Sequence, residues 1–247
     1  MAHVHAPPAT DHPAGSMQLL VMSRFELRTK SSVISVPSIV ERVFAFLAVR
    51  EHPQLRSTIA STLWIDTTDD RAAANLRTAL WKARQTVAEW FVAEGNRVAL
   101  APSVQTDLSS TVAQAKRLIR VGAPLEPRDS DPVGLTCDLL PEWDEEWILY
   151  ERERLRQLRI HALEELCRKL SALGRSAEAV DAGLAAVAAE PLRESAQRAL
   201  IGAYLDEGNV SESRRQYFCY RELLWEQLGL EPSHALRTMV GLTRKAQ

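Results

Sequence analysis

A helix-turn-helix pattern that repeats every 34 residues constrains the fold of this chain more than any other feature. Gly174 and Gly208 stand 34 residues apart, each between two stretches of helical periodicity. Small or apolar residues recur at the same offset: Ala162 and Ala196, Leu166 and Leu200, Leu170 and Tyr204, Ala177 and Ser211, Ala179 and Ser213. This period, with small residues after the glycine, is typical of tetratricopeptide repeats, whose paired helices approach closely. We therefore expect a C-terminal all-α, tetratricopeptide-like helical repeat domain.

Stop signals divide this part of the chain into successive helices. A loop rich in Gly, Pro and Asp follows a first helix, and later breaks occur at glycines and at two Glu-Pro pairs. The helices expected between these breaks cover roughly 144–173, 176–189, 192–207, 211–228 and 233–245. Trp143 and Trp147 are one helical turn apart and are expected to anchor the long helix in the core. The Arg-rich run over 151–159 is expected to form ion pairs along a solvated helix face.

The preceding residues predict a small sheet, three helices and a hairpin. Alternating apolar residues over 17–36 predict about three antiparallel strands. The helices are expected from Ser38 (with a capping box between Ser38 and Glu41), from about Ser57, and from Asp69 or Asp70 to about Val87. Residues 90–101 predict two strands around an E-G-N turn. Three helices with a terminal hairpin make a winged helix-turn-helix, and a sheet before them is the OmpR-type arrangement.

Composition narrows the class of protein further. The longest apolar run, Val43 to Val49, has seven residues and is too short for a bilayer span. Residues 1–16 lack the basic and apolar regions of a secretory signal, and we expect a disordered tail there. Cys137, Cys167 and Cys219 lack metal-ligand spacing, and the last two are expected to be buried, inert thiols. These features favour a reduced, cytoplasmic protein.

No catalytic or metal-binding constellation is visible in the sequence. The chain lacks a G-x-x-x-x-G-K-[ST] phosphate loop, a G-x-S-x-G elbow, an H-E-x-x-H pair and zinc-type cysteine pairs. His3, His5 and His12 are expected to be solvent-exposed rather than metal ligands, and His161 to be an ordinary helix residue. The chain is therefore not expected to be an enzyme, nor to bind a cofactor or a metal.

The informative charge lies on the third N-terminal helix. The whole chain has a net charge of −2, but residues 71–97 hold five basic and two acidic side chains. One stripe of this helix is apolar and expected to be buried: Ala73, Leu76, Leu80, Ala83 and Val87. The rest carries the candidate DNA contacts: Arg71, Asn75, Arg77, Thr78, Lys82, Arg84 and Gln85. Trp81 stands between the Arg77–Arg84 edge and the outer face. Arg97, just after the hairpin turn, is placed to reach a phosphate or the adjacent minor groove.

Two interpretations of this basic face compete. A polar, basic face on a single helix is usually only a solvated surface. The position of this helix, third in order and directly before a hairpin, favours contact with double-stranded DNA. The alternative is a helical-repeat scaffold for protein–protein interaction that does not bind DNA.

Long stretches of the chain resemble a known family. Residues 138–159 (D-L-L-P-E-W-D-E-E-W-I-L-Y-E-R-E-R-L-R-Q-L-R), 189–201 (A-E-P-L-R-E-S-A-Q-R-A-L-I) and 215–233 are similar to the bacterial transcriptional activator domain. Residues 63–84 (L-W-I-D-T-T-D-D-R-A-A-A-N-L-R-T-A-L-W-K-A-R) resemble the DNA-binding domain that precedes it. Together they resemble the SARP family of antibiotic regulatory proteins in its short, two-domain form.

The resemblance implies a domain organisation and a function. It implies an OmpR-type winged-helix DNA-binding domain over 17–106 and a bacterial transcriptional activator domain over 107–247, after the tail of residues 1–16. The implied function is sequence-specific activation of a secondary-metabolite (antibiotic) gene cluster in the cytoplasm, associated with the nucleoid. Implied partners are direct-repeat DNA, RNA polymerase through its sigma factor or alpha subunit, and a second copy on DNA, with no membrane.

Two departures from the family qualify these expectations. The K-A-R-Q of residues 82–85 has fewer basic residues than the R-L-R-R common there, which predicts lower affinity. The nucleotide-binding module of the longer members is missing, which predicts that ATP-dependent control is absent.

Overall fold

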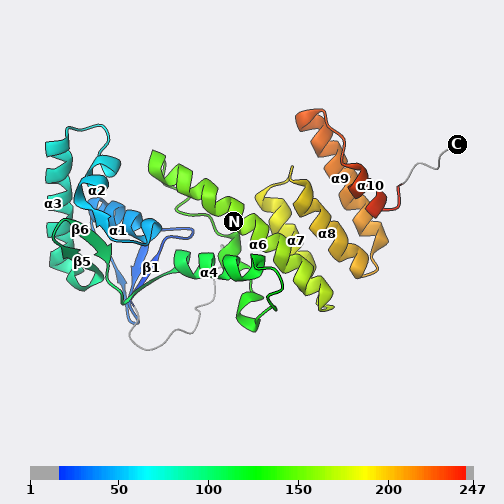
Figure 1. Cartoon of the computed structure of the whole chain (residues 1–247), viewed down its shortest axis with the longest axis horizontal. Coiled ribbons are helices and arrows are strands. Elements are labelled where there is room, and N and C mark those ends of the chain that lie inside the picture. The colour runs from blue at the N-terminus through cyan, green and yellow to red at the C-terminus, as the bar shows by residue number, and fades with distance from the viewer. Residues whose placement is uncertain (1–16, 243–247) are drawn as a thin grey trace, which may run out of the picture. The chain divides into compact units, whose positions relative to one another are not determined.

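The computed structural model describes residues 17–242, which form two compact units (Figure 1). Residues 17–111 and 137–153 make up the first unit, and residues 112–136 and 154–242 the second. The first unit combines small sheets with three helices, and the second is entirely helical. The expected fold class, mainly α with a winged helix-turn-helix before a helical repeat, is confirmed.

The first sheet has four strands rather than three. β1 (Met17–Leu20), β2 (Glu26–Arg28) and β3 (Val33–Ile34) pair antiparallel, as expected. β7 (Val104–Thr106) adds a parallel strand beside β1, with Leu19 opposite Thr106. The sequence did not predict β7, because a three-residue strand whose pairing partner lies far away in sequence leaves no local periodicity.

Asp107 connects this sheet to the next helix. α4 (Asp107–Ile119) begins directly after β7. The Asp107 carboxylate accepts hydrogen bonds from the backbone N–H groups of Val21 (2.9 Å) and Met22 (3.0 Å). Burial raises the pKa of Asp107 to about 6, although these backbone donors act in the opposite direction.

Three helices build the core of the first unit: α1 (Ser38–Arg50), α2 (Arg56–Leu63) and α3 (Asp69–Thr86). The predicted capping box at Ser38 is wrong. Pro37 is the N-cap of α1, and its carbonyl accepts the N–H groups of Val40 and Glu41, so Ser38 already has helical geometry. For the same reason the predicted caps of α3, Asp69 and Asp70, lie inside the helix after Thr68.

The expected hairpin is present and forms the wing. A short 3-10 helix, η1 (Ala88–Trp90), connects α3 to β5 (Phe91–Glu94) and β6 (Arg97–Leu100). Gly95 in the turn has a φ of +54°, which an L side chain rarely adopts. β4 (Gln54–Leu55) pairs with β6 and gives a sheet of order β4-β6-β5. The sequence did not predict β4, since two residues cannot show a period.

Residues 137–153, assigned by the sequence to the helical repeat, pack in the first unit. The backbone N–H of Leu140 donates to the carbonyl of Val21 at 2.9 Å, and Met22 and Leu139 form a β-bridge. Two ion pairs add to this packing: Arg42 with Glu145 at 2.8 Å and Arg50 with Glu151 at 2.6 Å.

The two tryptophans of this segment pack against winged-helix residues. Trp147, near the start of α6 (Glu146–Ala172), contacts Phe46 edge-to-face at 5.4 Å, and Trp143 stacks on Phe25 at 6.2 Å. Trp147 is buried and Trp143 half-buried. The prediction that both tryptophans anchor the long helix one turn apart is therefore wrong for Trp143, which precedes the helix.

The Arg-rich run of α6 is only in part the solvated face that the sequence indicated, since Glu153 and Arg154 are exposed but other members of the run are covered. Arg152 donates to the backbone carbonyls of Leu139 and Trp143, both at 2.9 Å, and Arg156 forms an ion pair with Glu190. Arg159 is buried. These partners lie far along the chain rather than three or four residues away, because this part of α6 is covered by other segments.

The second unit contains the repeat. Its further elements are η2 (Pro127–Asp129), α5 (Val133–Thr136), α7 (Ser176–Ala189), α8 (Glu194–Asp206), α9 (Val210–Leu228) and α10 (His234–Met239). Three predicted repeat pairs are buried at both positions: Ala162 with Ala196, Leu166 with Leu200, and Ala179 with Ser213. Gly174 and Gly208 both have positive φ, as the turns between paired helices require. The last helix ends at Met239, earlier than expected, because Gly241 turns the chain with a φ of +72°.

Close helix packing in this unit depends on a glycine. A Cβ at Gly183 of α7 would lie 3.1 Å from the Leu200 Cα and 3.2 Å from the Cys167 Sγ. Cys167 is buried, as expected, and burial raises the pKa of its thiol to about 12, so the thiol is inert. Cys219 is exposed on α9, which corrects the expectation that it is buried.

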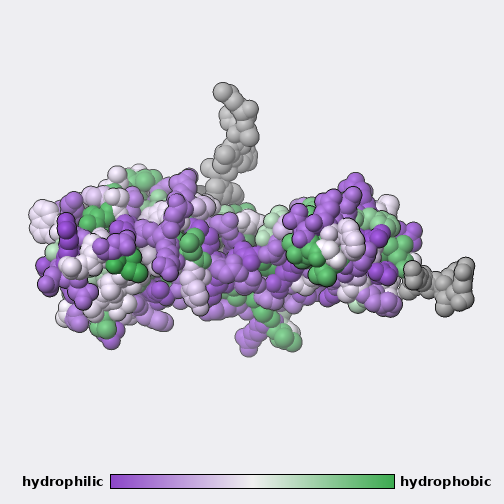
Figure 2. All heavy atoms as spheres, turned by 90° about the horizontal axis from the view of Figure 1, so that it is seen from above, coloured by the Kyte–Doolittle hydropathy of each residue, from purple (hydrophilic) through white to green (hydrophobic). Residues whose placement is uncertain are grey.

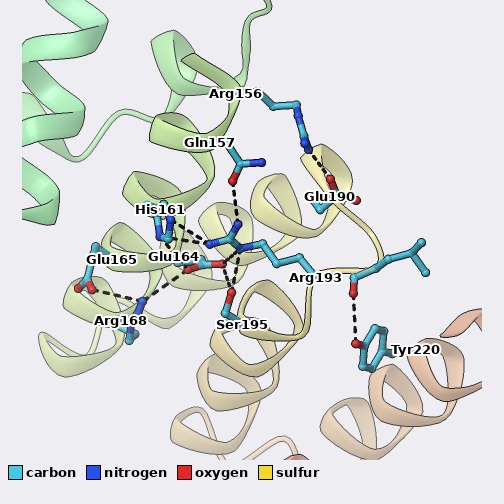
Figure 3. Close-up of polar contacts among 11 residues, drawn as sticks. Arg156, Gln157, His161, Glu164, Glu165, Arg168, Glu190, Arg193, Ser195 and Tyr220 are labelled. Carbon is cyan, nitrogen blue, oxygen red and sulfur yellow. Dashed lines mark hydrogen bonds and ion pairs between the residues drawn. The ribbon is translucent and has the colours of Figure 1, made fainter. Parts of the chain in front are cut away.

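A polar cluster joins α6 to α8 (Figure 3). The buried Glu164 carboxylate accepts hydrogen bonds from the Arg193 Nε (2.9 Å) and the Ser195 Oγ (2.6 Å). The Arg193 guanidinium also donates to Gln157 at 3.1 Å and lies within hydrogen-bond distance of the His161 ring. His161 therefore belongs to a structural network, in agreement with its expected role as an ordinary helix residue.

Candidate DNA-binding surface

The third helix is held by its apolar side at the edge of the first unit (Figure 1). Leu76, Leu80, Ala83 and Val87 are buried, as the predicted stripe requires. Ala72 and Ala79 are also buried, whereas Ala73 is only half-buried. The buried side is wider than the predicted stripe because α3 packs against both α1 and α2.

The solvent side of α3 presents most of the predicted DNA contacts. Those that are exposed are Arg71, Arg77, Thr78, Arg84 and Gln85. Asn75 and Lys82 are half-buried and lie at the margins of this face rather than on its outer side. The Thr78 hydroxyl donates to the Ala74 carbonyl at 3.0 Å, so it retains only acceptor capacity for a ligand. We call Arg71, Arg77, Thr78, Trp81, Arg84 and Gln85 the α3 outer face.

The cations of this face are free to bind an external anion. Within residues 17–242, no hydrogen bond or ion pair holds the side chains of Arg71, Arg77 or Arg84. Arginines elsewhere in the unit have carboxylate partners, for example Arg42 with Glu145 and Arg50 with Glu151. An unpaired guanidinium keeps all five N–H donors available for a phosphate group.

Trp81 is the functional candidate that the sequence analysis did not include among the site residues. Its side chain is 62% exposed and lies one helical turn from both Arg77 and Arg84. The sequence places Trp81 between the Arg77–Arg84 edge and the outer face but gives it no role. Its spacing from the two arginines would have identified it as part of the same face.

The wing places Arg97 beside the loop that contains Pro53. Arg97 is exposed and donates one hydrogen bond, from Nη1 to the Pro53 carbonyl at 2.9 Å. Arg56 reaches the wing turn through a 3.4 Å bond to the Gly95 carbonyl. Arg97 is therefore anchored to the backbone while its other donors are available.

The positive charge is local to α3 and the wing. Residues 137–153, which complete the first unit, bring seven acidic side chains and one arginine. Asp69 and Asp70 occupy the first turn of α3, where carboxylates favour the helix dipole but oppose an anionic ligand. A phosphate group is therefore favoured beside Arg77 and Arg84 more than beside Arg71, which shares the first turn of α3 with these two carboxylates.

The described residues contain no candidate metal site and no membrane-spanning helix. Between residues 17 and 242, no group of three or more His, Cys, Asp or Glu side chains could hold a metal ion. His3, His5 and His12, for which exposure was expected, lie outside the residues that the structure describes. No helix in the described part of the chain is long and apolar enough to cross a membrane.

The chain combines a winged helix-turn-helix with a tetratricopeptide-like helical repeat. The third helix of the winged helix-turn-helix has a basic face whose arginines pair with no other described residue. These two features together define the structural class of the protein. Residues 135–241 match the bacterial transcriptional activator domain. This range includes residues 137–153, which pack in the winged-helix unit, so the matched range and the compact units do not coincide.

A solved structure supports the same arrangement. The fold is similar to that of Mycobacterium tuberculosis EmbR, solved in complex with a low affinity phosphopeptide, with a TM-score of 0.73 and 17% sequence identity. The match covers 92% of this chain and 65% of that chain, so this chain spans about two thirds of the EmbR length. The search of curated proteins found no match.

Together these findings place a bacterial transcriptional activator domain at residues 135–241, within a fold that is similar to that of EmbR.

Proposed function

We propose that this protein is a sequence-specific DNA-binding activator of transcription. The observation that carries the proposal is the α3 outer face, which holds three arginines without internal partners and an exposed tryptophan between Arg77 and Arg84. Helix α3 would enter the major groove, and Arg97 on the wing would contact the adjacent backbone. The SARP-type domain organisation supports this function.

The residues of the α3 outer face are suited to different parts of DNA, namely phosphates, base edges and apolar groups. Arg71, Arg77 and Arg84 are suited to phosphates, although an arginine in the groove can also bind guanine with two hydrogen bonds. Gln85 carries an amide that suits adenine. Trp81 offers no acceptor and only one donor, so its contribution is apolar contact with a thymine methyl group or a deoxyribose.

The remaining expectations from the family belong to the same proposal. We infer that the operator consists of direct repeats near a promoter of a secondary-metabolite gene cluster and that the protein recruits RNA polymerase. Cytoplasmic, nucleoid-associated localisation and self-association on DNA follow from this function. The domain assignment, DNA binding by residues 17–106 and activation by residues 107–247, is proposed with the change that residues 137–153 complete the first unit.

The test is the salt dependence of binding to promoter fragments of the neighbouring gene cluster, measured by fluorescence anisotropy. Arg77→Ala and Arg84→Ala should each lower the affinity and, where the side chain binds a phosphate, reduce the slope of log K against log salt by roughly one. Trp81→Ala should lower the affinity with no change of slope, because it removes no charge. Replacing thymine by uracil in the operator identifies a methyl contact.

The matched control is Arg215→Ala, since Arg215 is an exposed arginine of the second unit that pairs with Glu212. It should leave both affinity and slope unchanged. If the three α3 variants bind as the wild type does, α3 is not the recognition helix. Binding that is absent or insensitive to salt favours the scaffold without DNA binding.

A further inference from the structure

The outer side of α9 carries an apolar surface that no described residue covers. Phe218 is 47% exposed and Trp225 is 60% exposed. They line a shallow cavity of about 560 Å³ together with Arg221, Glu222 and Glu231. Leu228 and Leu230, at the C-terminal end of α9 and just after it, are also exposed. Figure 2 shows that hydrophobic residues (green) form patches on an otherwise largely hydrophilic surface. We call the five cavity-lining residues the α9 cup.

The packing of α9 explains why these aromatic rings face outward. Its opposite side contributes Tyr217, Tyr220 and Leu224 to the core. Phe218 and Trp225 are seven residues apart and therefore lie on one side, two turns from each other. The two rings flank Arg221 and Glu222 on this side, so the exposed surface of α9 combines apolar and charged side chains. Exposed apolar surface that polar residues border marks a site of interaction.

The turn after α9 forms the wall of the cup. Gly229, with a φ of +65°, ends the helix and directs the chain back along it. Glu231 then meets Arg221 in a two-pronged ion pair, with distances of 2.9 Å from Nε to Oε2 and 3.0 Å from Nη2 to Oε1. This pairing lowers the pKa of Glu231 and holds the wall in place.

The charge that remains at the cup is negative. Glu231 pairs with both Arg221 (2.9 Å) and Arg237 (3.8 Å), whereas Glu222 and Glu226 are exposed and have no ion-pair or hydrogen-bond partner within residues 17–242. Three carboxylates therefore stand against two guanidinium groups. Two free carboxylates beside an indole ring attract a cation, which gains from the carboxylates and from the face of Trp225. The same carboxylates repel a phosphate backbone, so the cup does not suit DNA.

We propose that the α9 cup is a docking site for a cationic amphipathic helix of a partner protein. An apolar side chain of the partner enters the cup between Phe218 and Trp225, and its Lys or Arg side chains lie against Glu222 and Glu226. A helix fits better than an extended segment because an apolar stripe along a helix pairs with a similar stripe on another helix. The inference deepens the proposed function, on which it rests for the partner's role in activation.

The probe is a synthetic amphipathic helical peptide of about five turns, with leucines on one face and lysines beside them. A second peptide has glutamates in place of the lysines. Binding of each labelled peptide to the full chain is measured by anisotropy at two salt concentrations. We expect the lysine peptide to bind and the glutamate peptide to bind at least about tenfold more weakly, with the difference decreasing at high salt.

Variants of the full chain locate the site. Trp225→Ala should weaken binding of the lysine peptide about tenfold, as expected for a central aromatic contact. The double substitution Glu222→Gln and Glu226→Gln should reduce the preference for lysine over glutamate. Tyr150→Ala, which removes a 76% exposed aromatic ring of the first unit, and Glu207→Gln, an exposed acid of the second, are matched controls and should have no effect.

Three results would overturn the proposal: equal binding of the two peptides, unchanged binding by Trp225→Ala, or a wild-type dimer in sedimentation that Trp225→Ala dissociates. The last would make a second copy the occupant. All altered side chains are exposed, and circular dichroism checks that each variant is folded. DNA binding is measured in parallel, so absence of operator binding rejects the proposed function while the peptide assay still tests the cup.

Discussion

At the scale of single residues, the tryptophans of this chain differ in role because some are buried and others are exposed, which composition does not reveal. Trp90 and Trp147 are buried and stabilise the first unit, whereas Trp81 and Trp225 are largely exposed. Exposing an indole ring forgoes a large gain from burial, so an exposed tryptophan within a charged surface marks a candidate contact. Trp81 lies among unpaired arginines and Trp225 beside unpaired carboxylates, which gives the two surfaces opposite preferences.

Asp107 provides a prediction at the same scale. Its pKa is raised by burial to about 6 from an ordinary value of 3.8, so the folded chain holds the proton more tightly than the unfolded chain. The resulting stabilisation is fully present below pH 3.8 and is lost as the pH rises through 6. The free energy of unfolding should change by at most about 3 kcal/mol between these two pH limits. Asp107→Asn should remove this pH dependence, as urea unfolding at pH 4.5, 6 and 7.5 would show; the same profile in both proteins would contradict it.

At the scale of elements, α3 and α9 are built alike, but their exposed sides carry opposite charges. Each buries one side in the core of its own unit and presents the other to solvent. The α3 outer face is basic and suits DNA, whereas the α9 cup is acidic and suits a cationic protein segment. The proposed function needs both kinds of contact, and the chain places the two surfaces on different elements.

Close helix packing gives a second prediction, at the scale of elements. Gly183→Ala should destabilise the second unit by about 1–3 kcal/mol, because the added methyl group meets the backbone of Leu200 at 3.1 Å. Gly202→Ala in α8 is the matched control, since its nearest neighbour is the flexible end of Met239 at 3.3 Å and alanine favours a helix. Thermal unfolding of the two variants should differ clearly. Similar losses in both would show that the close approach at Gly183 is unimportant.

At the scale of the whole molecule, the first unit is built from two separated parts of the chain. Residues 137–153 complete it through the Trp147–Phe46 contact and through ion pairs to Arg42 and Arg50. The sequence places these residues in the transcriptional activator domain, which suggests that the chain could be cut before them. The structure indicates that such a cut exposes the core of the winged helix.

A fragment that ends near Ser109 should therefore be less stable than the same residues in the full chain. Loss of residues 137–153 leaves Phe46 uncovered and the two arginines without their carboxylates, so the melting temperature should fall. In the full chain, Trp147→Ala should cost about 3–5 kcal/mol, whereas Trp225→Ala should cost little because its ring is exposed. A fragment as stable as the intact unit would contradict this reading of the packing. Operator binding is measured only on samples shown to be folded.

The sequence by itself determined the elements whose signals are local. Periodicity and turn residues predicted α3, the wing hairpin and the 34-residue repeat, and the spacing of charges predicted which side of α3 faces solvent. Tertiary structure alone decided the features that depend on contacts between distant residues. The pairing of β7 with β1, the assignment of residues 137–153 to the first unit and the long-range partners of the Arg-rich run leave no periodic signal. The exposure of Trp225 and Cys219 was likewise decided by which neighbours cover each helix, because a helical wheel gives the direction of a side chain and not what lies beyond it.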